Sequence, residues 1–225
     1  MAGVETPNAA RGKLVRKALQ LNARNARGRG LPAIVLMTDD RLNADWRAAV
    51  RALPSGSAFV VRHRDARMRE MLARHVRTIC AARRVRLLIA DDPHLAMRLR
   101  ADGVHLPERR MVLASGLKAR HPKWLVTTAA HGAAAASAAG RYCADAVFIA
   151  PAFATASHPG GAALGVVRLA AIANAARIFT YALGGIDEGT VARLQTTAVC
   201  GVALISGWID AAHTGVRNAE TTLKR

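Results

Sequence analysis

The stretch RLLIADDPHLAMRLRADGVHLPE, residues 86–108, decides the fold class. It opens with an apolar run at 87–90, which is typical of a strand buried on both faces. A short amphipathic segment at 93–99 begins with proline, a residue favoured in the first turn of a helix. Residues 104–106 then form a second apolar run. The stretch predicts a strand–helix–strand unit with the acidic pair 91–92 at the carboxyl end of its first strand.

The same alternation recurs along the rest of the chain. Strands are predicted at 33–37, 58–61, 87–90, 104–106, 124–126, 146–149, 178–183 and 202–205. Helices are predicted at 45–53, 66–83, 94–99, 111–120, 131–141, 164–173 and 187–195, with a last helix after Gly207. Strands that alternate with helices, without a second-domain boundary, predict a single (β/α)8 TIM barrel over residues 31–225.

Residues 1–30 are polar and basic, and they contain Gly28 and Gly30. We interpret them as a flexible basic N-terminal extension of the barrel. The alternative is a short amphipathic helix over 13–26, with Leu14, Ala18 and Leu21 along one side.

Composition excludes several classes of protein. Hydrophobic residues make up 52% of the 225 residues, which is enough for a large core. The N-terminal residues lack the apolar core of a secretory signal, and the apolar runs are too short for a membrane span, so we expect a cytoplasmic protein without a membrane partner. The three cysteines lack metal-ligand spacing, which indicates small buried thiols and not a disulfide framework or a zinc site.

The formal net charge is +18 and the pI is about 11.5. Such a charge attracts polyanions, and a basic RNA-associated protein is one hypothesis. The positive residues are mostly arginines spread through the helices, however, and only 4% of residues are aromatic. We therefore expect no specific nucleic-acid partner.

Two glycine-containing pairs lie at predicted strand ends. Gly184-Gly185 follows the seventh strand and Ser206-Gly207 the eighth. In barrels of this type these two loops commonly bind a phosphate group through backbone N–H groups, although ordinary turns use the same residues.

Other candidate site residues also follow strands. Arg62 and Arg64 share one face at the end of the second strand, where two guanidinium groups suit a phosphate or a pyrophosphate. Asp91 can hold Mg²⁺ or belong to a helix cap. His131 follows the fifth strand and can transfer a proton or cap a helix. Thr155, Ser157 and His158 populate a loop that can close over a ligand.

These residues together resemble the thiamine phosphate synthase family, including its thiazole tautomerase branch. The segments that carry the resemblance span Leu31 to Gly207: VVRHR (60–64), LIADD (88–92), ADGVHLP (101–107), AAH (129–131), PAFATASH (151–158), ALGGI (182–186) and LISG (204–207).

The resemblance implies a set of roles. A synthase joins an aminopyrimidine diphosphate to a thiazole phosphate and uses Mg²⁺ while pyrophosphate leaves. By position Arg62 matches the family's arginine, Arg64 replaces a lysine, and Asp91 matches one metal-binding aspartate. The other matching positions are the hydroxyl pair Thr155 and Ser157, and the thiazole-phosphate contacts Gly185, Ile205 and Ser206.

This sequence also departs from the synthase pattern. Arg110 occupies the position of the second Mg²⁺-binding aspartate, and His158 that of a lysine that contacts pyrophosphate. Ala90, Val60 and Ala129 stand where the family has asparagine, glutamine and serine. The resemblance therefore implies a degraded Mg²⁺-pyrophosphate site.

We accordingly favour a tautomerase-like reaction, which needs no cofactor: proton transfer on a bound thiazole phosphate, with His131 as acid and base. A divergent synthase that uses Mg²⁺ is the first alternative, and a phosphate-binding barrel without turnover is the second. The expected partners are small molecules, and the sequence leaves a homo-oligomer open.

Overall fold

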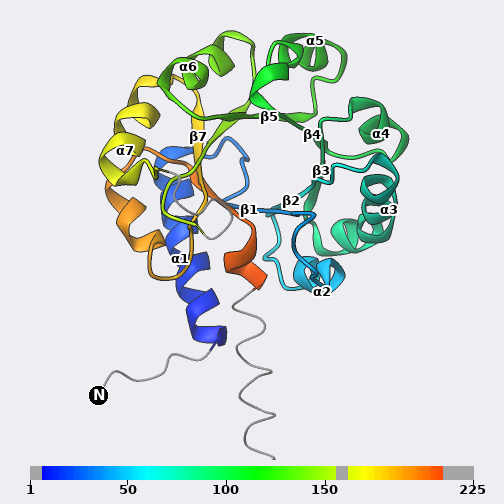
Figure 1. Ribbon diagram of the computed structural model, residues 1–225, viewed down its shortest axis with the longest axis horizontal. Coiled ribbons are helices and arrows are strands. Elements are labelled where there is room, and N and C mark those ends of the chain that lie inside the picture. The colour runs from blue at the N-terminus through cyan, green and yellow to red at the C-terminus, as the bar shows by residue number, and fades with distance from the viewer. Residues whose placement is uncertain (1–6, 156–161, 210–225) are drawn as a thin grey trace, which may run out of the picture.

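A computed structural model describes residues 7–155 and 162–209, and within them parallel strands close into a barrel. The strands pair in chain order from β1 to β8, and β8 pairs back onto β1. Helices surround this ring on the outside (Figure 1). The predicted (β/α)8 barrel is confirmed.

The elements lie close to their predicted positions. The strands are β1 (Ile34–Met37), β2 (Ala58–Val61), β3 (Arg86–Ala90), β4 (Gly103–Leu106), β5 (Leu125–Ala130), β6 (Ala146–Ile149), β7 (Phe179–Leu183) and β8 (Gly201–Leu204). The helices are α1 (Pro7–Asn25), α2 (Trp46–Arg51), α3 (Ala66–Arg83), α4 (Pro93–Arg98), α5 (Leu113–Arg120), α6 (Ala133–Arg141) and α7 (Gly165–Ala175), with 3-10 helices η1 (Glu108–Arg110) and η2 (Val191–Thr196).

One predicted α-helix is wrong. Residues 187–190 form a turn, and only the 3-10 helix η2 follows it. The Asp187 carboxylate accepts hydrogen bonds from the backbone N–H groups of Gly189 (2.9 Å) and Thr190 (2.7 Å), as an N-cap residue does. The backbone that follows has 3-10 spacing, because the N–H groups of Arg193 and Thr197 donate to carbonyls three residues earlier.

The strands separate two apolar layers, because successive side chains of a strand point to opposite faces. One layer fills the space between barrel and helices, with Leu36, Phe59 and Ile89 among its members. The other fills the barrel interior, with Val60 and Phe148. Burial on both faces explains why the strands read as continuous apolar runs.

Helix α1 corrects the expectation of a flexible extension. Leu14, Ala18 and Leu21 are buried against the barrel. The Asn22 side-chain amide donates to two backbone carbonyls, and that of Asn25 to two more, all in the segments that precede β1 and β8. Helix α1 is therefore packed on the barrel from Arg11 onward, while residues 1–6 lie outside the described residues.

The cysteines differ in exposure. All three carry free thiols, and Cys80 and Cys200 are buried as expected. Cys143 is exposed, because it lies in the turn that follows α6. Within the described residues, the helices are too short or too polar to cross a membrane.

Candidate functional site

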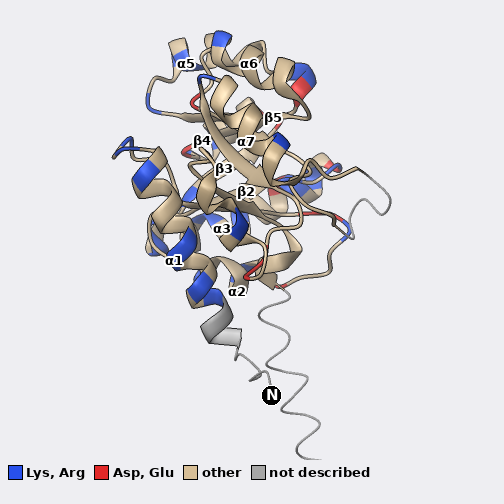
Figure 2. Cartoon of the chain, turned by 90° about the vertical axis from the view of Figure 1, so that its left-hand side faces the viewer, with Lys and Arg blue, Asp and Glu red and all other residues tan. Residues whose placement is uncertain are grey.

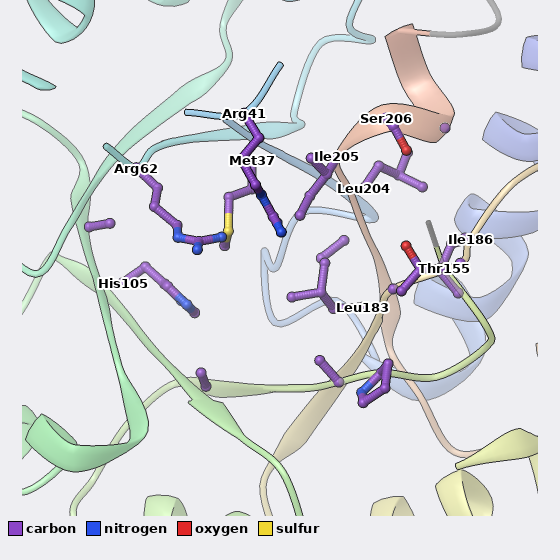
Figure 3. A pocket seen from close by; sticks show the side chains of 18 of the residues that line it. Met37, Arg41, Arg62, His105, Thr155, Leu183, Ile186, Leu204, Ile205 and Ser206 are labelled. Atoms are coloured by element: carbon purple, nitrogen blue, oxygen red, sulfur yellow. The ribbon is translucent and has the colours of Figure 1, made fainter. Parts of the chain in front are cut away.

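A cavity of about 1150 Å³ opens at the carboxyl ends of the strands. This is the end of a (β/α)8 barrel at which ligands bind. Figure 3 shows Arg62 and His105 reaching into the cavity from one side, with Thr155 and Ser206 on the other. The cavity therefore has two chemically different halves.

The predicted pair Arg62 and Arg64 does line this cavity. Each guanidinium group lies near a carboxylate that follows β1: Arg62 Nη1 is 3.9 Å from Asp39 Oδ2, and Arg64 Nε is 3.6 Å from Asp40 Oδ2. The Thr38 hydroxyl ties β1 to β2, because it donates to the Arg62 carbonyl (2.6 Å) and accepts from the Arg62 N–H (2.8 Å).

Asp39 is a buried carboxylate that the sequence analysis missed. Arg41 Nε donates to Asp39 Oδ1 at 2.9 Å, and the Arg41 backbone N–H donates to the same oxygen. These hydrogen bonds, with the positive charges of Arg41 and Arg62, hold the pKa of Asp39 well below its usual range. The carboxylate thus stays charged and fixes the guanidinium group of Arg41 beside the cavity.

His105 lies on β4 and also escaped the sequence analysis. Its ring packs on Phe148 with centroids 4.6 Å apart, and Nδ1 lies 2.9 Å from the Thr127 hydroxyl oxygen. Burial, helped by the charge of Arg62, lowers the pKa of His105 to about 3. The ring is therefore neutral at physiological pH. Successive side chains of a strand point to opposite faces, so a histidine between Val104 and Leu106 points away from both of them. This alternation could have identified His105 as a residue that faces the cavity.

His131 is placed where the sequence predicted, directly after β5 in the cavity wall. The structure adds a partner, Glu108 in η1. Glu108 Oε2 lies 2.7 Å from His131 Nδ1 and accepts the His131 backbone N–H at 2.9 Å. A carboxylate at one ring nitrogen orients the imidazole and leaves the other nitrogen for proton transfer.

The glycine pairs of the last two strands meet in the other half of the cavity. Gly184, Gly185, Ile205, Ser206 and Gly207 all line it.

At two of these positions, neighbouring backbone atoms leave no space for a side chain. Gly185 has a φ of +64°, and a Cβ there would come within 2.4 Å of the Ala154 carbonyl oxygen. A Cβ on Gly207 would lie equally close, 2.4 Å, to the Ile186 carbonyl oxygen. Glycine therefore lets the loops pack tightly and brings their backbone to the cavity.

Thr155 also lines this half, as predicted. Ser157 and His158, predicted in the same loop, lie outside the described residues.

Asp91 forms an ion-pair cluster at the cavity mouth. Its Oδ1 accepts from Arg110 Nη1 at 2.7 Å and its Oδ2 from Arg109 Nη2 at 2.8 Å. The adjacent Asp92 accepts from Arg69 Nη2 (3.2 Å) and from the Leu95 N–H (2.9 Å), which caps α4.

This cluster does not fit the Mg²⁺ site that the family resemblance implies. Mg²⁺ requires several hard oxygen ligands in octahedral geometry. Both oxygens of Asp91 are instead bound to guanidinium groups, and Arg110 supplies a positive charge where a second carboxylate was expected. Among the described residues, no cluster of three or more His, Cys, Asp or Glu side chains could hold a metal ion.

Comparisons with known proteins identify relatives of this chain. A family model described as thiamine monophosphate synthase matches residues 34–208. The thiamine-phosphate synthase of Chloroflexus aurantiacus is 32% identical over 170 residues, covering 73% of this chain and 78% of the relative. The thiamine-phosphate synthase of Herpetosiphon aurantiacus is 30% identical over 184 residues, which cover 80% of this chain and 88% of the relative. Among solved structures, the thiamine phosphate pyrophosphorylase from Pyrococcus furiosus has the same fold, with a TM-score of 0.68, 23% identity and coverage of 90% of this chain and 100% of that chain.

Proposed function

Because this chain belongs to the thiamine monophosphate synthase family, we propose that it joins an aminopyrimidine diphosphate to a thiazole phosphate and releases pyrophosphate. The relatives named above are synthases, which supports this reaction over the tautomerase-like proton transfer that the sequence favoured.

The observation that carries the proposal is the pair of unlike halves of the cavity. Arginines 62, 64 and 109 line the half near β2–β4, while glycine-containing backbone at 184–185 and 205–207 lines the half near β7–β8. Guanidinium groups suit a diphosphate, and glycine-rich loops suit a single phosphate. Two phosphorylated substrates need two such ends, whereas a thiazole carboxylate phosphate would bring only a single carboxylate to the three guanidinium groups.

The reaction requires charge stabilisation more than proton transfer. The thiazole nitrogen lone pair forms a bond to the pyrimidine methylene carbon, and the carbon–oxygen bond to the diphosphate breaks with its electrons leaving on pyrophosphate. Arg62 and Arg64 can stabilise the negative charge that develops on the leaving group.

The test is an assay of purified protein with both substrates. We expect thiamine phosphate and pyrophosphate in equal amounts, measured by chromatography. Arg62→Gln should lower kcat/KM about 100-fold, because it removes one charged donor to the leaving group. Arg120→Gln, an exposed arginine at the end of α5, is the matched control and should leave kcat/KM unchanged. Absence of both products would refute the proposal.

Thiazole tautomerisation is the second candidate, and the His131–Glu108 pair favours it. Its assay uses the thiazole carboxylate phosphate alone, without the pyrimidine substrate. Conversion that His131→Ala abolishes, with thiazole-phosphate affinity nearly unchanged, would establish it. Saturable binding without conversion in either assay would instead identify a phosphate-binding barrel.

A further inference from the structure

We propose that guanidinium groups replace Mg²⁺ at the diphosphate end of this cavity, so that the chain binds pyrophosphate without a metal ion. The inference rests on the proposed synthase function and concerns the half of the cavity near β2–β4. It starts from the disagreement between the Mg²⁺ expected for the family and the residues present.

The first argument is that both carboxylate oxygens of Asp91 already accept hydrogen bonds from arginines. Arg110 Nη1 donates to Asp91 Oδ1 at 2.7 Å and to the Asp91 backbone carbonyl at 3.1 Å, and Arg109 holds Oδ2 at 2.8 Å. Both arginines belong to η1, the short helix directly after β4. A divalent cation at Asp91 would have to displace two charge-assisted hydrogen bonds and stay beside two positive charges.

The second argument is that the neighbouring carboxylate is equally occupied. Asp92 caps α4 and pairs with Arg69, whose Nη1 also donates to the His63 carbonyl at 2.8 Å. Asp92 therefore cannot complete a metal site with Asp91. Arg110 replaces the only other carboxylate that the resemblance predicts there.

The third argument is that donors remain for an anion. The Arg69 side chain lines the cavity, and its two Nη groups make one hydrogen bond each, to the His63 carbonyl and to Asp92, which leaves each of them a second N–H group. Arg109 also lines the cavity and uses one Nη group on Asp91. A guanidinium group carries five N–H donors, so each can still bind phosphate oxygens.

The charge balance supports the same conclusion. In this half of the cavity guanidinium groups outnumber carboxylates even when Glu108 is included: Arg41, Arg62, Arg64, Arg69, Arg109 and Arg110 against Asp39, Asp40, Asp91, Asp92 and Glu108. The aspartates fix the arginines in position, and the surplus positive charge takes the role of the metal ion toward pyrophosphate.

The first experiment is calorimetry of the full chain with inorganic pyrophosphate in a chelating buffer. We expect saturable binding without metal, and no tighter binding when Mg²⁺ is added. Arg109→Gln should weaken this binding at least about tenfold, because a charged hydrogen-bond donor is lost. Arg120→Gln removes the same charge at the end of α5 and should have no effect. Binding by the wild type only with Mg²⁺, or an unchanged affinity in Arg109→Gln, would overturn the inference.

The second experiment restores a carboxylate. Arg110→Asp should create a saturable Mn²⁺ site, detected by electron paramagnetic resonance, that the wild type lacks. The inference would be contradicted if the wild type bound Mn²⁺ saturably and Asp91→Asn abolished that binding. This outcome does not depend on whether the Arg110 variant folds.

The two proposals fail separately. Metal-free pyrophosphate binding without formation of thiamine phosphate would refute the synthase function and leave this anion site standing. Thiamine phosphate formed only with Mg²⁺ would refute the metal-free site and leave the synthase function standing.

Discussion

His105 lines the cavity, and the burial of its ring makes the folded protein less stable at acidic pH. Its ring is enclosed by Phe148 and Thr127, and it lines the cavity with a ring that stays neutral. A neutral imidazole offers one donor and one acceptor nitrogen. Because Nδ1 contacts the Thr127 hydroxyl, the other nitrogen remains for a ligand. The burial that fixes this ring also makes its protonation unfavourable.

The pH dependence of folding should reveal this burial. The pKa of His105 is about 3 in the folded protein, below the ordinary value of 6.5, so the unfolded chain binds a proton that the folded chain excludes. The free energy of unfolding should therefore fall as the pH drops from 6.5 toward 3. When the pH is lowered from 6.5 to 4.5, the free energy of unfolding should fall in both proteins, and the fall should be about 2 kcal/mol smaller in His105→Gln than in the wild type.

Urea denaturation at both pH values measures this difference. Asp39 does not interfere, because its lowered pKa affects stability only near and below the ordinary carboxyl value of 3.8. Between pH 7 and 8 the two proteins should respond alike. Identical losses in both proteins below pH 6.5 would show that His105 takes up a proton without unfolding.

The candidate site could be predicted in part from the sequence. Arg62, Asp91 and His131 were identified because residues that follow a strand come to the mouth of the barrel. Their partners were not predictable in the same way. The pairing of Asp91 with Arg109 and Arg110 depends on distances between β3 and η1, which the order of residues does not contain.

Among the elements, α1 contributes more to the fold than its composition indicated. Only one narrow side of this helix is apolar, and the remainder is largely basic. The two asparagines that bond to the carbonyls before β1 and β8 act across long sequence distances. Local pattern offered an amphipathic helix over 13–26 only as the alternative, whereas contacts with residues far along the chain hold that helix on the barrel.

Two leucines of α1 provide a matched test. Leu21 is fully buried, whereas the Leu19 side chain is 54% exposed. Leu21→Ala should lower the free energy of unfolding by about 3 kcal/mol, because it leaves a cavity between helix and barrel. Leu19→Ala should change it by less than about 0.5 kcal/mol. Chemical denaturation measures both, and equally small effects would mean that α1 is not part of the cooperative fold.

At the scale of the whole molecule, positive charge is widely distributed. Figure 2 shows lysine and arginine on α1, α2 and α3 as well as near α5 and α6, and not gathered on one face. The fold itself followed from the sequence because eight apolar runs with helices between them leave few other topologies. The wide distribution of positive charge was also expected, because the arginines are spread through the predicted helices.

This distribution predicts weak binding of RNA that ignores base sequence. We expect two unrelated labelled RNA strands to bind with equal affinity at low salt. The association constant should fall about a thousandfold between about 50 and 200 mM salt, because the interaction releases counterions. Fluorescence anisotropy measures both quantities. A preference for one RNA that survives the higher salt would instead identify a specific nucleic-acid surface.

The seam between β1 and β8 has a consequence for biosynthesis. Residues 34–36 pair with residues 202–204, and Arg11 Nη2 donates to the Trp208 carbonyl at 3.0 Å. On the ribosome α1 and β1 emerge before the other strands of the barrel, yet their partner β8 is translated after all of them. The ring therefore cannot close until β8 has left the exit tunnel, and the nascent barrel stays open while β2 to β7 are translated.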